Sequence, residues 1–196
     1  HGQKRLEGVT IAQVDERRKP ILSTKEYIPC DTLLLSVGLI PENELTKKAN
    51  VSINNITNGA YVDQNRETNI PGIFACGNVL HVHDLVDFVS EEAEIAGKSA
   101  AEYIKNQAEE KINVNIKTDG KIRYTVPQII TKNKDVTVYF RVSDVYKNVK
   151  INVYNGENTV LSKKKAKVAP GEMESIKLKK EIFEDCTELV FKLEEA

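Results

Sequence analysis

The spacing of the apolar residues changes near residue 112, and this change most constrains the fold. Before it, apolar side chains between Asp84 and Ala108 recur every three or four residues, as on one face of a helix: Leu85, Val89, Ala93, Ala96, Ala100 and Ile104. After it, short alternating runs are separated by Asn-Lys, Asn-Gly and Pro-Gly turns. Two regions of different architecture are therefore expected, 1–110 and 113–196, joined at 108–115.

The distribution of charge agrees with this division. Residues 1–112 carry 12 Lys and Arg against 17 Asp and Glu, whereas residues 113–196 carry 16 against 12. Neither excess is concentrated enough to indicate nucleic-acid binding, and the lysines at 163–167 are interpreted as a solvated strand edge. No stretch approaches the roughly 18 apolar residues of a membrane span, so no membrane insertion is expected.

The second region is typical of an all-β domain. It contains about seven short strand patterns and no helical pattern, a count that matches an immunoglobulin-like sandwich. Its charged and aromatic residues alternate as strand residues do, so sheet packing explains them without catalysis. We interpret it as a domain that serves association.

The first region predicts an α/β architecture. Alternation at 5–15 indicates a strand before a charged turn, and Leu33–Val37 is apolar on both faces, as in a strand covered from both sides. Ile73–Cys76 predicts a second buried strand, which ends at a glycine before the helix. Asp84 and Asp87 are expected in the first turn, where carboxylates meet free N–H groups. A strand that ends at a glycine and leads into a helix offers backbone N–H groups to electron-rich ligands at the edge of the sheet.

Two motifs in this region resemble those of one flavoprotein family. "TNIPGIFACGN", Thr68–Asn78, resembles the second flavin motif T-x-x-x-G-[IV]-[FY]-A-x-G-D, and only its last letter differs. "CDTLLLSVGLIPEN", Cys30–Asn43, is similar to the strand ending in G-x-x-P that closes the NAD(P)-binding domain. The region therefore resembles the pyridine nucleotide-disulfide oxidoreductase-like flavoproteins. Its sequence is most similar to those of the NAD(FAD)-dependent dehydrogenases associated with anaerobic glycerol-3-phosphate oxidation.

The resemblance implies a fold, cofactors and contact residues. It implies the last strands and the C-terminal helix of a two-dinucleotide-binding fold, with FAD and NAD(P)H as cofactors of the full-length enzyme. The implied cofactor contacts are Gly77, Asn78, Val79, Ser90 and Glu91. Asn78 stands where relatives have the aspartate that binds the FAD ribitol. No catalytic residue is assigned.

Neither G-x-G-x-x-G fingerprint is present, so both pyrophosphate loops are expected upstream of the first residue. The chain is accordingly interpreted as a C-terminal fragment that is inactive alone and holds no FAD. The electron acceptor is left open.

The histidines and cysteines leave further alternatives. His81 and His83 supply two ligands where zinc usually has three or four, so no metal site is expected. They could instead contact the residues that surround the flavin, or cap the helix. His83 could also supply a proton near the flavin. Cys76 is interpreted as inert, and three widely spaced cysteines favour a reducing cytoplasm. The alternative function is an interaction module that docks a partner dehydrogenase subunit or a second copy of the chain.

Overall fold

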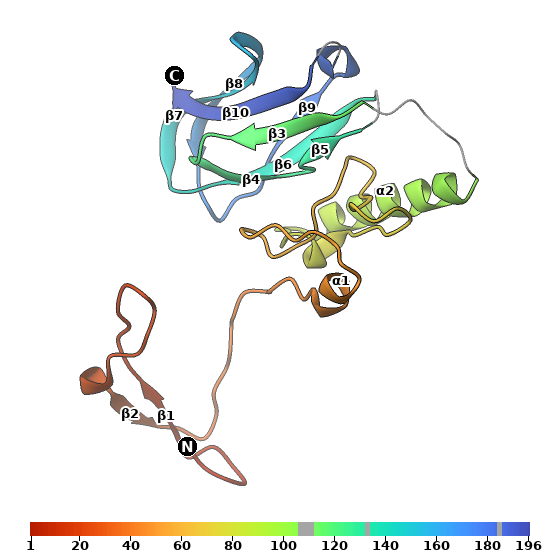
Figure 1. Cartoon of the computed structure of the whole chain (residues 1–196). Helices are drawn as coiled ribbons and strands as arrows, with labels where there is room; N and C mark the ends of the chain where they lie inside the picture. The colour runs from red at the N-terminus through yellow and green to blue at the C-terminus, as the bar shows by residue number, and fades with distance from the viewer. Residues whose placement is uncertain (106–111, 132–133, 184–185) are drawn as a thin grey trace. The chain divides into compact units, whose positions relative to one another are not determined.

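The computed structural model describes residues 1–105, 112–131, 134–183 and 186–196. The chain forms two compact units, His1–Gly38 and Leu39–Ala196, and each is described by itself (Figure 1). Among the described residues, no helix combines the length and the apolar character needed to cross a bilayer.

The first unit is built on one β-hairpin. Strand β1 (Gly8–Ile11) pairs antiparallel with β2 (Glu26–Pro29). In the connection, the Asp15 carboxylate accepts two following backbone N–H groups at 2.9 and 2.8 Å, which forms an Asx turn at the charged break. The short helix η1 (Leu22–Thr24) comes next. The strand predicted at 5–15 is therefore present at Gly8–Ile11, and Val14 adds an isolated bridge to Pro20.

The apolar run Leu33–Val37 is not a buried strand, and that prediction is wrong. The run is extended but unpaired, and Leu34 and Leu35 are 90% and 75% exposed. Among the described strands, none lies beside it in a sheet. Apolar patterning shows which surface a segment could bury, but burial also requires a partner surface.

The second unit begins with a loop-rich layer and one long helix. Helix α1 (Glu44–Lys48) leads into residues 51–75, which are held by isolated bridges: Ile53 to Ala60, Val62 to Thr68, and Glu67 to Phe74. The turn η2 (Gly77–Val79) and helix α2 (Val86–Ile104) follow. The helix predicted at 84–108 is confirmed for Val86–Ile104, and residues 106–108 lie outside the described residues.

Two expectations for this layer are wrong in detail. Ile73–Cys76 forms no strand, since only Phe74 makes a bridge and the four side chains are partly exposed. The buried residues of α2 are Glu92, Ala96 and Ser99, whereas Ala93 of the predicted stripe is exposed. The buried face is therefore turned by roughly 60° from the predicted stripe, with Ala96 common to both.

The remaining strands form two sheets (Figure 1). Their bounds are β3 (Val114–Thr118), β4 (Ile122–Val126), β5 (Ile129–Ile130), β6 (Val136–Val142), β7 (Tyr146–Asn155), β8 (Asn158–Val168), β9 (Glu174–Leu178) and β10 (Glu188–Glu195), with a short helix η3 (Lys180–Phe183) before the last. One sheet has the order β5-β3-β10-β7-β8 and the other β4-β6-β9. Only the pairing of β3 with β10 is parallel among the described strand pairs.

The two sheets enclose one hydrophobic core. Alternate side chains of their strands are buried in it, as the period of two predicts: Val138, Phe140 and Val142 on β6, and Leu189, Phe191 and Leu193 on β10. The rings of Phe140 and Phe191 meet edge to face with centroids 6.0 Å apart. The all-β character predicted for 113–196 is confirmed for the described residues, while immunoglobulin-like connectivity remains a proposal.

The loop-rich layer and the sheets share a second apolar cluster. Tyr124 and Val126 of β4 pack in it with four residues of the layer: Val51, Ala60, Val62 and Leu80. The Thr131 hydroxyl also donates to the Asp63 carboxylate at 2.6 Å. The boundary predicted at 108–115 lies partly outside the described residues, so the division into 1–110 and 113–196 remains a prediction.

We expect residues 113–196 to fold when expressed alone, because the buried core between the sheets lies entirely within them. The fragment loses the partners of Tyr124 and Val126, and burying one such side chain contributes about 1.5–3 kcal/mol. It should therefore be only marginally stable. Circular dichroism should give a β-type spectrum and a cooperative melt. A non-cooperative transition would refute autonomous folding.

Candidate functional site

The turn η2 before helix α2 requires glycine at its first position. Gly77 has a φ of +74°, a conformation that residues with a Cβ rarely adopt. A Cβ there would also come within 3.3 Å of Val89 Cγ1. The Gly77 N–H donates to Glu92 Oε2 at 2.7 Å. This N–H is thus not open to a ligand, contrary to the expectation that the turn before the helix offers free backbone N–H groups. The cofactor contact of Gly77 stays a prediction.

Asn78 and Val79 are held by hydrogen bonds to neighbouring loops. The Asn78 side-chain oxygen accepts the His83 N–H at 3.1 Å, and the Val79 carbonyl accepts from Asn43 Nδ2 at 2.7 Å. Asn78 is partly exposed, and its NH₂ group has no partner among the described residues. An amide NH₂ can donate to a ligand hydroxyl. The environment of Asn78 therefore fits the ribitol contact that the flavin motif implies.

Ser90 and Glu91 lie exposed on the second turn of α2. The Ser90 hydroxyl donates to the Val86 carbonyl of its own helix at 3.1 Å, and Glu91 accepts from the Tyr139 hydroxyl of β6 at 3.4 Å. Neither side chain hydrogen-bonds to η2 in the described part of the chain. The structure thus does not join them to Asn78 in one site, and their contact with a cofactor remains a prediction.

A buried carboxylate lies directly beneath this turn. The Glu92 side chain is 2% exposed, and each of its oxygens accepts from two donors. Oε1 accepts from Arg66 Nε at 2.9 Å and from His81 Nε2 at 3.3 Å. Oε2 accepts from the Gly77 N–H at 2.7 Å and from His83 Nε2 at 3.0 Å. We call Glu92, Arg66, His81 and His83 the Glu92 cluster.

Arg66 reaches the cluster from a strained turn. Its φ is +66°, in the left-handed region, which costs a residue other than glycine about 1–3 kcal/mol. The Asp63 carboxylate holds the turn by accepting the N–H groups of Asn65 and Glu67 at 2.8 and 3.0 Å. Such strain persists only where the surroundings over-determine it. The buried ion pair between Arg66 and Glu92 supplies part of that constraint.

The environment of Glu92 keeps it ionised. Burial by itself would raise its pKa, but the hydrogen bonds from His81 and His83 and the charge of Arg66 outweigh burial and hold the pKa well below its ordinary value of 4.5. For His81, burial is the largest effect and lowers its pKa from 6.5, despite the neighbouring carboxylate. Arg66 and Glu92 therefore compensate each other, with His81 neutral.

The histidine tautomers follow from the same geometry. An ionised carboxylate only accepts hydrogen bonds, so both Nε2 atoms carry the proton and donate it to Glu92. In the neutral His81 ring Nδ1 is then an acceptor, and the Nδ1 atoms of both rings are buried without a partner among the described residues. Both imidazoles bind the Glu92 carboxylate on α2. This contact limits the roles that the sequence left open for the two histidines.

His81, His83 and Glu92 also lie close enough to hold a metal ion, with one ligand atom from each within 4.8 Å of the others. Each Glu92 oxygen already accepts two hydrogen bonds. One of the two bonds to Oε1 comes from the Arg66 guanidinium. A cation that binds Glu92 would have to displace the Arg66 guanidinium from the carboxylate. Two positive charges would then be buried side by side. We therefore keep the expectation of no metal as a prediction.

Sequence reasoning missed Glu92 and Arg66 altogether. Glu92 lies four residues before Ala96 and seven before Ser99, so it shares their face of α2. A glutamate on a face otherwise made of small residues was the available signal. Nothing local marked Arg66 as its partner, because the two residues are 26 positions apart.

Two further residues differ from their predicted roles. Asp84 lies before α2 and caps nothing, since its carboxylate accepts from Arg141 and from the Met173 N–H at 2.6 Å. Asp87 lies in the first turn as predicted. Cys76 is not in a strand, but burial and the nearby Glu92 raise the pKa of its thiol. A protonated, partly buried thiol supports the interpretation of Cys76 as inert.

These observations define a mixed α/β region, with a glycine turn before a long helix, followed by two packed β-sheets. Residues 4–100, just under half of the chain, match the family model of the pyridine nucleotide-disulphide oxidoreductases. Members of this family typically bind FAD and NAD(P). Neither a curated protein nor a solved structure gives a significant match.

Proposed function

We propose that this chain is part of an NAD(P)H-dependent FAD flavoprotein oxidoreductase, in which hydride passes from nicotinamide to FAD and then to an acceptor. The observation that carries this proposal is the family match over residues 4–100, which includes η2 and most of α2. FAD, when bound, supplies the redox chemistry, and the protein binds and orients it.

In this proposal the residues around η2 form one wall of the flavin site. Asn78 donates its free amide N–H to a ribitol hydroxyl, and its oxygen stays bonded to the His83 N–H. The Glu92 cluster does not touch the cofactor but fixes the distance between η2 and α2 through the Gly77 N–H. Val79, Ser90 and Glu91 complete the proposed contacts. Upstream dinucleotide-binding loops would supply the pyrophosphate sites.

The finer parts of the proposal rest on the sequence alone. They are a relation to the NAD(FAD)-dependent dehydrogenases of anaerobic glycerol-3-phosphate oxidation, a cytoplasmic location, and an immunoglobulin-like sandwich in 113–196. That sandwich would associate with a partner dehydrogenase subunit or with a second copy of the chain. Light scattering of the complete gene product, with and without residues 113–196, tests the association, since deletion should reduce the measured mass beyond that of the missing residues.

The experiment for the flavin site is a substitution of Asn78 in the complete gene product. The purified protein should be yellow, and Asn78→Ala should weaken FAD binding by about 1–3 kcal/mol, the loss expected when a buried polar partner is removed. Fluorescence titration of the apoprotein with FAD measures this. Asn55→Ala, an exposed asparagine of the same layer, is the control. Equal affinities of Asn78→Ala and the unsubstituted protein would remove Asn78 from the site.

A further inference from the structure

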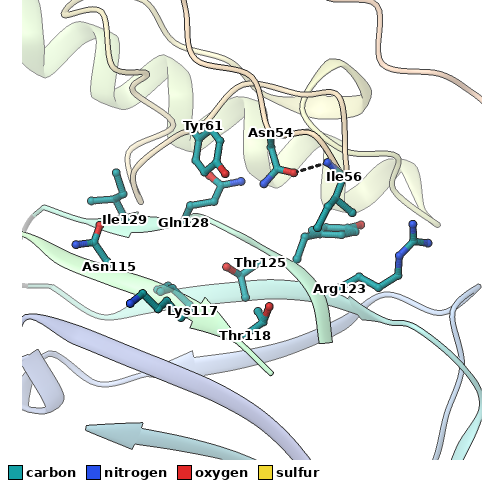
Figure 2. A pocket seen from close by; sticks show the side chains of 12 residues that line it. Asn54, Ile56, Tyr61, Asn115, Lys117, Thr118, Arg123, Thr125, Gln128 and Ile129 are labelled. Atoms are coloured by element: carbon teal, nitrogen blue, oxygen red, sulfur yellow. Dashed lines mark hydrogen bonds between the residues drawn. The ribbon is translucent and has the colours of Figure 1, made fainter. Parts of the chain in front are cut away.

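A second site lies away from the flavin motif, between the loop 54–61 and the strands β3, β4 and β5. Figure 2 shows this pocket, which has a volume of about 420 Å³. Its lining combines polar and apolar side chains: Asn54, Asn115, Lys117, Thr118, Arg123, Thr125 and Gln128, with Ile56, Tyr61, Ile116, Tyr124 and Ile129. Small-molecule sites typically enclose about 300–1,000 Å³, so the pocket has the size of a ligand site.

Gln128 carries an unsatisfied donor in the lining of this pocket. The residue is 6% exposed, and its Oε1 accepts the Val62 N–H at 2.9 Å, which fixes how the amide is turned. Its Nε2 is buried and has no hydrogen-bond partner among the described residues. Leaving such a group unpaired costs about 1–3 kcal/mol. A ligand oxygen at this position would recover that cost.

Asn54 presents a second donor from the opposite wall. Its Oδ1 accepts the N–H groups of Ile56 and Thr57 at 2.8 and 3.2 Å, so its NH₂ group is directed away from its own loop. In Figure 2 the amide ends of Asn54 and Gln128 point toward one another. Two donors cannot bond to each other, but both can donate to one acceptor between them.

The charge at the pocket is positive. Lys117 is paired with Glu188 at 2.6 Å, whereas Arg123 makes no ion pair with any residue that the structure describes. A guanidinium presents several donors in a plane and matches carboxylate and phosphate groups. The hydroxyls of Thr118 and Thr125 add groups that can both donate and accept.

We propose that this pocket binds a small polyhydroxylated organic anion. One oxygen of its carboxylate or phosphate accepts from the amides of Gln128 and Asn54, and the charge of the group faces Arg123. The threonine hydroxyls bond to hydroxyl groups of the ligand. This site is independent of the flavin assignment, because it uses the sheets and the loop 54–61 and no residue of η2 or α2.

The test uses three sugars of similar size with the intact chain: glucuronate, glucose 6-phosphate and glucose. Calorimetry measures affinity, and the side-chain amide signals of Gln128 and Asn54 in ¹H–¹⁵N NMR spectra report the site. At least one anion should bind and shift both amide signals, while glucose binds at least about tenfold more weakly. Comparison of the two anions shows whether the site takes a carboxylate or a phosphate.

Two variants and one control locate the binding. Gln128→Glu keeps the oxygen that accepts from Val62 but replaces the donor by an acceptor, so anion binding should be lost. Arg123→Gln, on an exposed side chain that leaves the core intact, should weaken binding about tenfold or more. Lys163→Gln removes an equal charge from β8 and should leave affinity unchanged. The proposal is overturned if neither anion binds, if glucose binds equally well, or if Arg123→Gln binds like Lys163→Gln.

Discussion

Replacement of Glu92 by alanine is expected to lower the free energy of unfolding by about 3–5 kcal/mol, because it leaves the Arg66 guanidinium buried without its counter-charge. The N–H donors of His81, His83 and Gly77 lose their acceptor at the same time. Urea denaturation followed by circular dichroism measures the change. The loss should appear as a lower midpoint with an unchanged slope.

Glu94→Ala is the matched control for this substitution, since Glu94 lies on the same helix and is exposed. Its carboxylate pairs with Lys98 one turn later, and exposed pairs of this kind contribute little. The two alanines have the same helix propensity, so the comparison isolates burial and pairing. Similar losses for the two variants would mean that the Glu92 cluster does not stabilise the fold.

The second large effect is expected from Arg66→Met, which should destabilise the fold and weaken the dependence of stability on pH. In the unsubstituted chain the folded pKa of His81 is depressed, so only the unfolded state takes up a proton as the pH falls below 6.5. Stability is therefore lost as the pH falls from 6.5 towards the folded pKa. The lowered pKa of Glu92 acts in the same direction below 4.5. Both groups make the fold less stable in acid.

Without the Arg66 charge, the pKa of His81 rises towards 6.5, although burial, the largest cause of its depression, remains. The folded and unfolded pKa values of His81 then differ less, so less stability is lost as the pH falls below 6.5. We expect the variant to lose about 3–5 kcal/mol at neutral pH and to be less sensitive to acid than the unsubstituted chain.

Unfolding free energies near pH 5.5 and pH 7.5 measure this smaller pH dependence, and NMR titration of the His81 ring gives the shift directly. Arg17→Met, an exposed arginine in the hairpin loop of the first unit, controls for the loss of one positive charge. If Arg66→Met keeps the pH slope of the unsubstituted chain, Arg66 does not set the protonation of the cluster.

Local patterns in the sequence predicted those elements whose stabilising contacts repeat along the chain. Short alternating runs predicted strands where β3 to β10 lie, and the core side chains of β6 and β10 are alternate residues. Helix α2 has a period near 3.6 and was located to within a few residues. The motif that ends at Asn78 also predicted an oxidoreductase region, in agreement with the family match over residues 4–100.

The tertiary structure decided which surfaces are buried and which charges meet. The sequence made Leu33–Val37 apolar, but the run stays exposed because no described strand pairs with it. It placed Glu92 on a helix, but Arg66, 26 residues away, gives that carboxylate its compensating charge inside the protein. Periodicity reflects contacts between near neighbours in the chain, whereas burial of a charge depends on distant residues that only the folded chain brings together.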